Sequence, residues 1–140
     1  MNLLVLNGVN LNLLGSREPG IYGNQKYKEL EAYIKDYCKK NKIKVKIIQT
    51  NDEAKFIDYI HKSNKYGCLI INPGAWTHYS YAIRDAVLAV KATCCEVHLT
   101  DPQKREEFRH VSVLDEICPV VSGKGFDSYI EAIKILEDDL

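Results

Sequence analysis

Apolar residues form five short runs along the chain, and the segments between these runs repeat apolar residues at helical spacing. The runs span residues 3–6, 43–48, 68–71, 94–99 and 117–121. Several of them are continuous rather than alternating, which is typical of parallel strands covered on both faces. The stripes between them predict four helices, around residues 30–38, 56–60, 82–90 and 129–136.

Strands that alternate with helices indicate a parallel sheet with right-handed crossovers. Five such units predict a flavodoxin-like, doubly wound α/β fold, in which helices cover both faces of a five-stranded parallel sheet. No linker, repeat or low-complexity segment interrupts the pattern, so we expect a single domain over residues 1–140. Ligands of such folds bind beyond the carboxyl ends of the strands. We therefore expect a site among residues 7–23, 72–78 and 100–109.

The first of these segments, residues 7–23, is unusual in length and content. It holds three asparagines and four glycines, which is too polar and too glycine-rich for a buried element. A strand-to-helix connection usually takes about 2–6 residues. A long, ordered loop at this position is most often functional, so we interpret it as part of the site.

Composition narrows the classes of function and the setting. The chain has 140 residues, and its 19 basic and 19 acidic side chains cancel, which gives no indication of binding to nucleic acid or a membrane. No apolar stretch approaches the roughly 20 residues of a membrane span, and we expect no signal peptide. Five cysteines, two of them adjacent, fit neither a disulfide framework nor a metal motif. We expect buried free thiols and a cytoplasmic location.

Arg17 and Tyr22 are the candidate chemical groups of the first loop. A free tyrosine has a pKa near 10 and is a poor base at neutral pH, whereas a nearby guanidinium favours the phenolate. The two residues can therefore form a base and its activator. For an arginine and a tyrosine taken alone, an exposed arginine and a surface-packed tyrosine are the more common explanation.

The second loop begins at Asn72 and reaches His78. The Asn72 amide can both donate to and accept from hydroxyl groups, and His78 can donate to a polyol or an anion. The alternative is an ordinary turn into the next helix, which Ser80 or Thr77 would cap.

Glu96 and His98 lie in the second half of the fourth apolar run and are expected on the same face of a strand. The carboxylate can hold one imidazole tautomer and make His98 a general acid. The backbone N–H groups of Leu99 and Thr100 can bind a carboxylate. A buried structural ion pair is the alternative interpretation of Glu96 and His98.

Arg105 and Arg109 lie in a predicted short helical turn, where one arginine can face the cleft while the other is exposed or pairs with Glu106. A zinc site that uses His78, His98 and His110 with Glu96 lacks the usual ligand spacing. The sequence has no GxGxxG, GxxxxGK[ST] or GxSxG motif, so dinucleotide, P-loop and serine-hydrolase chemistry are disfavoured.

Three segments together resemble type II 3-dehydroquinate dehydratase. They are residues 7–23, residues 71–86, and residues 96–101 followed by 105–112. The resemblance spans nearly the whole chain in order and length, and it is specific because the three long motifs share one register.

The resemblance implies an anti (trans) elimination of water from 3-dehydroquinate, through an enolate, to give 3-dehydroshikimate. Tyr22 then removes the C2 proton, and Arg17 lowers the Tyr22 pKa and stabilises the transition state. A water held by Asn10 stabilises the enolate. His98, oriented by Glu96, protonates the departing C1 hydroxyl.

The resemblance also implies the binding residues and the assembly. The implied substrate-binding residues are Asn72, His78, Asp85, Leu99, Thr100 and Arg109. Asp85 matches a position that reaches the site of a neighbouring subunit, in a dodecamer built of trimers. No metal or organic cofactor is implied, and the reaction serves either the shikimate pathway or quinate breakdown.

Three departures from the family pattern leave the implied acid, base and arginine intact. Val9 replaces a proline, Trp76 replaces smaller or other aromatic residues and is expected to alter the pocket wall, and Asp101 replaces an asparagine. Two other classes of protein stay open. One is a flavodoxin-like module that binds FMN or a phosphorylated ligand, and the other is a non-catalytic homologue.

Overall fold

A computed structural model describes residues 1–16, 20 and 24–140 of the chain. Its five strands form one all-parallel sheet in the order β2-β1-β3-β4-β5. The strands are β1 (Asn2–Asn7), β2 (Lys44–Gln49), β3 (Gly67–Asn72), β4 (Thr93–Val97) and β5 (Val120–Val121). This order confirms the predicted flavodoxin-like fold, because the strand order reverses direction beside β1 and β3.

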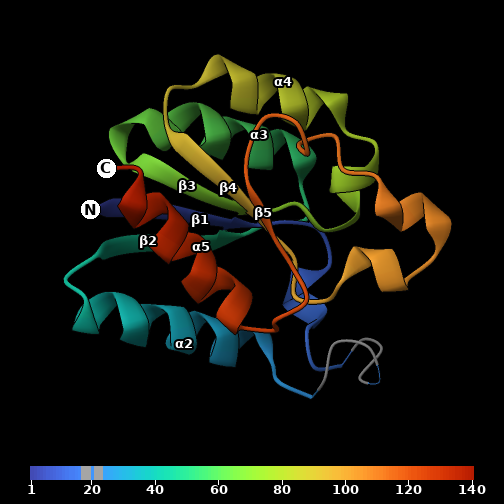
Figure 1. The fold of residues 1–140 in the computed structure, drawn as a ribbon, viewed down its shortest axis with the longest axis horizontal. Coiled ribbons are helices and arrows are strands. Elements are labelled where there is room, and N and C mark those ends of the chain that lie inside the picture. Colours follow the sequence, from blue (N-terminus) through green and yellow to red (C-terminus); the bar gives the residue numbers. More distant parts are fainter. Residues whose placement is uncertain (17–19, 21–23) are drawn as a thin grey trace.

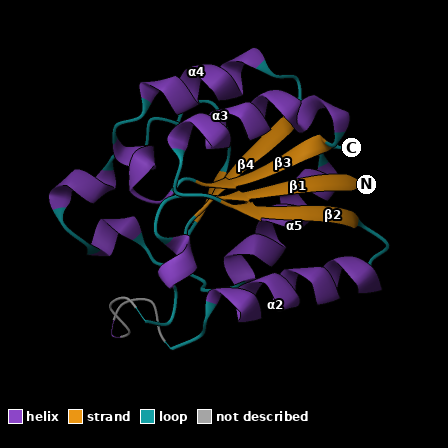
Figure 2. Cartoon of the chain, turned by 180° about the vertical axis from the view of Figure 1, so that it is seen from behind, coloured by secondary structure: helices purple, strands orange, loops and turns teal. Residues whose placement is uncertain are grey.

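Helices cover both faces of the sheet, as predicted (Figure 1). Helices α2 (Tyr27–Lys40) and α5 (Asp127–Asp138) lie on one face, and α3 (Glu53–His61) and α4 (Tyr81–Ala89) lie on the other. Side chains alternate along each strand, so Leu3 and Val5 pack in the α2/α5 core and Leu4 and Leu6 pack in the α3/α4 core. The cartoon from behind shows the same two layers (Figure 2).

Two strand boundaries differ from the prediction. Strand β4 ends at Val97, so His98 and Leu99 lie just beyond it rather than inside it. Strand β5 is two residues long, because the N–H groups of Ile117 and Cys118 both bond back to the Leu114 carbonyl in a turn. The apolar character of these residues is explained by burial beside the sheet and not by strand pairing.

The loops that follow β1 and β3 are in close contact. The Gly8 N–H donates to the Asn72 carbonyl at 2.7 Å, and a Cβ on Gly8 would lie 2.7 Å from the Pro73 carbonyl oxygen. Gly74 has a φ of +62° and approaches the Val9 carbonyl equally closely. Glycine is required at both positions because a side chain would collide with the backbone. The two loops therefore form one continuous floor at the carboxyl end of the sheet.

The five cysteines are buried free thiols, which confirms that prediction. Among the described residues, no helix is long and apolar enough to cross a membrane.

Candidate active site

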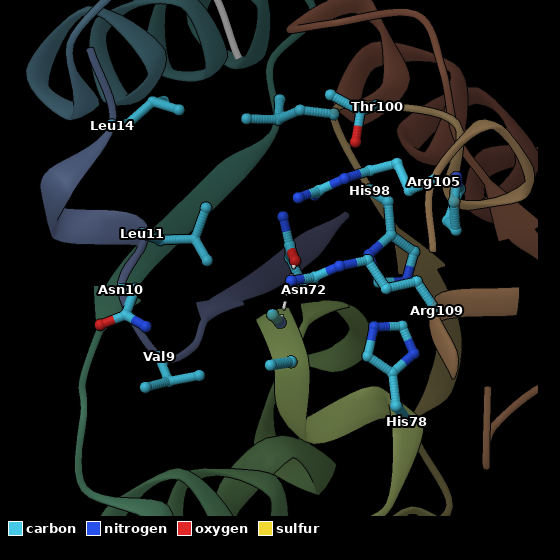
Figure 3. A pocket seen from close by; sticks show the side chains of 14 residues that line it. Val9, Asn10, Leu11, Leu14, Asn72, His78, His98, Thr100, Arg105 and Arg109 are labelled. Atoms are coloured by element: carbon cyan, nitrogen blue, oxygen red, sulfur yellow. Dashed lines mark hydrogen bonds between the residues drawn. The ribbon is translucent and has the colours of Figure 1, made fainter. Parts of the chain in front are cut away.

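A pocket lies at the carboxyl end of the sheet and draws on all three predicted loops (Figure 3). Its described lining residues are Val9, Asn10, Leu11 and Leu14 from the first loop, Asn72, Gly74, Ala75 and His78 from the second, and His98, Leu99, Thr100, Pro102, Arg105 and Arg109 from the third. Apolar side chains of the first loop face basic and amide groups of the other two. None of these lining residues carries a carboxylate, so the pocket suits an anionic ligand.

His98 is held from behind by Glu96. The imidazole Nε2 lies 2.5 Å from Glu96 Oε2, and the Glu96 side chain is fully buried. A carboxylate accepts hydrogen bonds, so Nε2 carries a proton and Nδ1 is the ring nitrogen left for a ligand. The predicted pairing of the two side chains is therefore confirmed, and it assigns the tautomer of neutral His98.

Glu96 also accepts hydrogen bonds from two hydroxyls. Thr77 Oγ1 donates to Oε2 at 2.5 Å and Ser112 Oγ donates to Oε1 at 2.7 Å. Burial opposes ionisation of Glu96, but the hydrogen bonds from His98, Ser112 and Thr77 outweigh it and hold the pKa of this carboxyl below its usual value. We call Thr77, Glu96, His98 and Ser112 the carboxylate cluster.

Asn72 is embedded in a second buried network, which lies on the opposite face of the sheet. Its Nδ2 donates to the Tyr129 hydroxyl at 2.9 Å, and the Tyr129 hydroxyl donates to Asn7 Oδ1 at 2.6 Å. Asn7 Nδ2 in turn donates to the Tyr27 hydroxyl at 3.2 Å. Burial raises the pKa of Tyr27 to about 12 and that of Tyr129 further, so both phenols are neutral. We call these four residues the amide–tyrosine chain.

Both arginines of the third loop reach into the pocket, toward Asn72. One arginine was predicted to face the cleft and the other to be exposed or paired with Glu106. Arg109 is the one that pairs with Glu106, through Nε at 2.5 Å, and it nevertheless lines the pocket with its terminal guanidinium nitrogens. Phe108 supports this wall, because its ring packs under the Arg109 guanidinium and edge-on to His78.

His78 lines the pocket with its ring fixed by the backbone. Nδ1 lies 2.7 Å from the Val111 carbonyl, which accepts its proton. Burial lowers the pKa of His78 below the ordinary imidazole value, although the bond to Val111 opposes this. A neutral His78 in this tautomer presents Nε2 as an acceptor, whereas the sequence predicted a donor. The predicted helix cap is Ser80, whose Oγ accepts from the Ile83 N–H at 3.1 Å.

The Leu99 and Thr100 backbone, which the sequence analysis expects to bind an anion, and Asn10 both line the pocket. Within the described part of the chain, no acceptor takes the N–H groups of Leu99 and Thr100, while the Leu99 carbonyl accepts from Gly125 at 2.9 Å. Asn10 has a left-handed backbone with φ of 69° and is tied to Asn51, whose Oδ1 accepts the Asn10 N–H at 2.9 Å. Both features border the pocket.

Two predicted site residues, Arg17 and Tyr22, lie outside the residues that the structure describes. Asp85 is exposed on α4 and is not part of the pocket lining. Trp76, expected in the pocket wall, is instead buried edge-on against Phe56 in the α3/α4 core, so that expectation is wrong.

Sequence reasoning missed several supporting residues. Thr77 and Ser112 stand inside matched motifs but carry no obvious chemistry until Glu96 is placed between them. Tyr129 falls on an apolar helical stripe, which predicts only a core residue. Among the described residues, no group of three or more potential metal ligands is assembled.

Comparisons with known proteins identify the family. The family model for dehydroquinase class II matches residues 1–137. The chain is 45% identical to 3-dehydroquinate dehydratase of Thermotoga maritima over 141 aligned residues, which cover all of this chain and 97% of the relative. The chain therefore belongs to the class II dehydroquinase family.

Solved structures agree with this assignment. The type II dehydroquinase from Butyrivibrio crossotus superposes with a TM-score of 0.95 at 47% identity, covering 98% of this chain and 97% of the other. The enzyme from Propionibacterium acnes gives a TM-score of 0.92 at 37% identity, covering 99% and 98%.

Proposed function

We propose that this protein is a hydro-lyase that converts 3-dehydroquinate into 3-dehydroshikimate by anti elimination through an enolate. The observation that carries the proposal is His98, held by a buried carboxylate at the edge of a pocket whose described charged lining is basic. Elimination of a hydroxyl beta to a ketone needs one base, one acid and donors for an anionic polyol, and it needs no metal or organic cofactor.

In this mechanism Tyr22 takes the C2 proton while Arg17 favours its phenolate. The electron pair moves into the C3 carbonyl to form the enolate, which a water on Asn10 stabilises. The enolate then collapses, the C1–C2 double bond forms, and the C1 hydroxyl leaves as water with the Nδ1 proton of a cationic His98, whose Nε2 proton stays hydrogen-bonded to Glu96. The cycle closes when the Tyr22 phenol releases the C2 proton to solvent and the neutral His98 takes up a proton.

The described residues on either side of Arg17 and Tyr22 lie close together. A Cβ on Gly15 would lie 2.9 Å from the Gln25 carbonyl oxygen and 3.0 Å from that of Asn24. Gly15 directly follows Leu14 of the pocket lining. The position of these flanking residues beside the pocket supports Tyr22 as the base.

Substrate binding follows from the rest of the lining. Asn72, His78 and Arg109 take the hydroxyl groups, and the N–H groups of Leu99 and Thr100 take the carboxylate. Asp85 completes a neighbouring subunit's site in a dodecamer of trimers. Exposed Tyr81 and Leu88 on the same helix support burial of that face against a second copy. The buried free thiols suit a reducing cytoplasm.

The test is the ultraviolet absorbance of the conjugated enone product after addition of 3-dehydroquinate. Wild-type protein should turn over, and Tyr22→Phe and Arg17→Ala should each lose about 10²–10⁴ in turnover. Tyr33→Phe, which removes an exposed hydroxyl on α2, is the matched control and should behave as wild type. Near-wild-type rates for Tyr22→Phe would contradict the mechanism.

Borohydride distinguishes this mechanism from one that uses an imine. None of the described pocket residues is a lysine. Incubation with borohydride and substrate should therefore leave activity unchanged, and inactivation would indicate a Schiff base.

A further inference from the structure

We propose that Tyr129 is a positioning residue that fixes the orientation of the Asn72 amide and thereby sets what the pocket offers to substrate hydroxyls. This inference rests on the proposed function, in which Asn72 binds substrate. Tyr129 itself lies outside the pocket lining and acts through the amide–tyrosine chain.

The three most buried members of the amide–tyrosine chain come from separate elements of the fold. Asn7 and Tyr129 are fully buried and Asn72 is almost so. Asn7 and Asn72 are register partners at the carboxyl ends of β1 and β3, and both point to the face covered by α2 and α5. Tyr129 reaches them from α5. Buried polar groups at this depth need partners, and the Tyr129 hydroxyl bonds to both amides.

One backbone group sets the direction of the whole chain. The Gly74 N–H can only donate, and it lies 3.2 Å from Asn72 Oδ1, so that atom is the acceptor. The Asn72 NH₂ must then face Tyr129, whose oxygen accepts at 2.9 Å. The single Tyr129 proton consequently goes to Asn7 Oδ1 at 2.6 Å. None of these side chains can exchange its donor and acceptor roles without disrupting the hydrogen bond to its neighbour.

This direction decides how Asn72 meets a ligand. With one amide N–H on Tyr129 and one oxygen lone pair on Gly74, Asn72 retains one donor and one acceptor for the pocket. A flipped amide would place its NH₂ against the Gly74 N–H. It would also aim its oxygen at a Tyr129 hydroxyl whose proton is already committed to Asn7. Tyr129 therefore penalises the wrong amide orientation from beneath the pocket.

The experiment is a double-mutant cycle on the purified full-length protein with 3-dehydroquinate. Tyr129→Phe keeps the ring and removes the hydroxyl, so KM should rise about tenfold while kcat changes by less than about threefold. In an Asn72→Ala background the same substitution should no longer change KM, because Tyr129 acts through the missing amide. Tyr33→Phe is the control, since its hydroxyl bonds to Asp127 at the surface.

A second variant covers failure of Tyr129→Phe to fold. Asn7→Ala retains Tyr129 but removes the acceptor of its proton, so the hydroxyl becomes free to donate to a flipped amide, and KM should rise again. An unchanged KM in the folded Tyr129→Phe protein would overturn the inference. The same fold-change with and without Asn72 would also overturn it.

Failure of the proposed function gives a different result. In that case wild-type protein would not convert 3-dehydroquinate, and the ¹⁵N side-chain amide resonance of Asn72 becomes the deciding measurement. Tyr129→Phe should shift this resonance, and Tyr33→Phe should leave it in place. An Asn72 resonance unmoved by Tyr129→Phe would reject the positioning role whether or not the protein is active.

Discussion

Two polar clusters lie buried beneath the same end of the sheet, one on each face. The amide–tyrosine chain occupies the α2/α5 face and ends at Asn72, whereas the carboxylate cluster occupies the α3/α4 face and ends at His98. The alternation of side chains along neighbouring strands separates them, since Asn72 is one residue past Ile71 and Ile71 is the register partner of Glu96.

The clusters differ in how they hold their terminal residue. In the amide–tyrosine chain every group is neutral, and the fixed direction of donation orients Asn72. In the carboxylate cluster one buried anion gathers three donors, and its charge orients His98. The neutral groups of the amide–tyrosine chain do not change charge in acid, whereas the Glu96 carboxylate becomes protonated as the pH falls through its lowered pKa. This difference fits the proposed roles, in which Asn72 binds substrate and His98 transfers a proton.

The largest expected effect follows from breaking the carboxylate cluster at its pocket end. His98→Ala removes the proposed general acid and should lower kcat by about 10²–10⁴ with a smaller change in KM. Steady-state kinetics by enone absorbance provides the measurement. His61→Gln, at the exposed end of α3, is the matched control. A kcat loss of less than about fivefold in His98→Ala would remove His98 from the proton-transfer role.

The next largest effect is the loss of stability expected when the amide–tyrosine chain loses the Tyr129 hydroxyl. Tyr129→Phe leaves Asn7 Oδ1 and Asn72 Nδ2 buried without this partner, and it should lower the free energy of unfolding by about 3 kcal/mol. Because no charged group is involved, the cost should be the same at pH 7 and pH 4. Urea unfolding at the two pH values measures it. A cost that changes with pH would show that the two clusters are coupled.

A smaller and pH-dependent cost is expected for Ser112→Ala. The pKa of Glu96 is lowered on folding, so its contribution to stability is present above its unfolded pKa of about 4.3 and is lost as pH falls through the folded pKa. Ser112→Ala removes one donor and raises the folded pKa toward that of the unfolded chain. The free energy of unfolding should drop by about 2 kcal/mol at pH 7 and by less at pH 3.5.

Urea unfolding again provides the measurement, with Ser16→Ala as the control. Among the described residues, the Ser16 hydroxyl bonds to the Leu13 carbonyl at an exposed turn, so its removal should cost little at either pH. An equal cost of Ser112→Ala at both pH values would mean that the serine does not stabilise the anion.

The smallest expected effect concerns His78, a pocket residue that belongs to neither buried cluster. Burial lowers the pKa of His78, so its NMR titration midpoint should fall below the ordinary value of about 6.5. The unfolded chain then binds the proton more tightly, so this group lowers stability as pH falls through that window. A midpoint for His78 above this ordinary value would contradict the buried, neutral assignment.

Most of the fold was predictable because the pattern of apolar runs is strong where strands are buried on both faces. The run at residues 68–71 is β3 almost residue for residue. The run at 117–121 failed because Ile117 and Cys118 are buried in a turn, and burial alone does not distinguish a turn from a strand. Periodicity reports which residues are covered, and it does not report which backbone groups are paired.

The site was predictable where chemistry and position coincide, as for the Glu96–His98 pair. It was not predictable where a residue acts through another. Tyr129 lies 57 positions from Asn72 in sequence and belongs to an apolar stripe, so nothing local marks its hydroxyl as functional. Thr77 and Ser112 are likewise ordinary polar residues until the fold brings them to opposite oxygens of one carboxylate.

The bond between His98 Nε2 and Glu96 has a mechanical consequence for proton delivery. Cβ is fixed to the main chain and Nε2 is bonded to the buried Glu96, so the ring is held at two points. Nδ1, the nitrogen left for the substrate, therefore has little freedom to move. The proposed proton donor, His98, is therefore fixed relative to the main chain of Leu99 and Thr100, whose N–H groups are proposed to bind the carboxylate. A leaving hydroxyl and a carboxylate on the same carbon would thus be held by one short, stiff segment. In the proposed mechanism, the distance between His98 and the leaving hydroxyl is then set by the backbone, and side-chain motion changes it little.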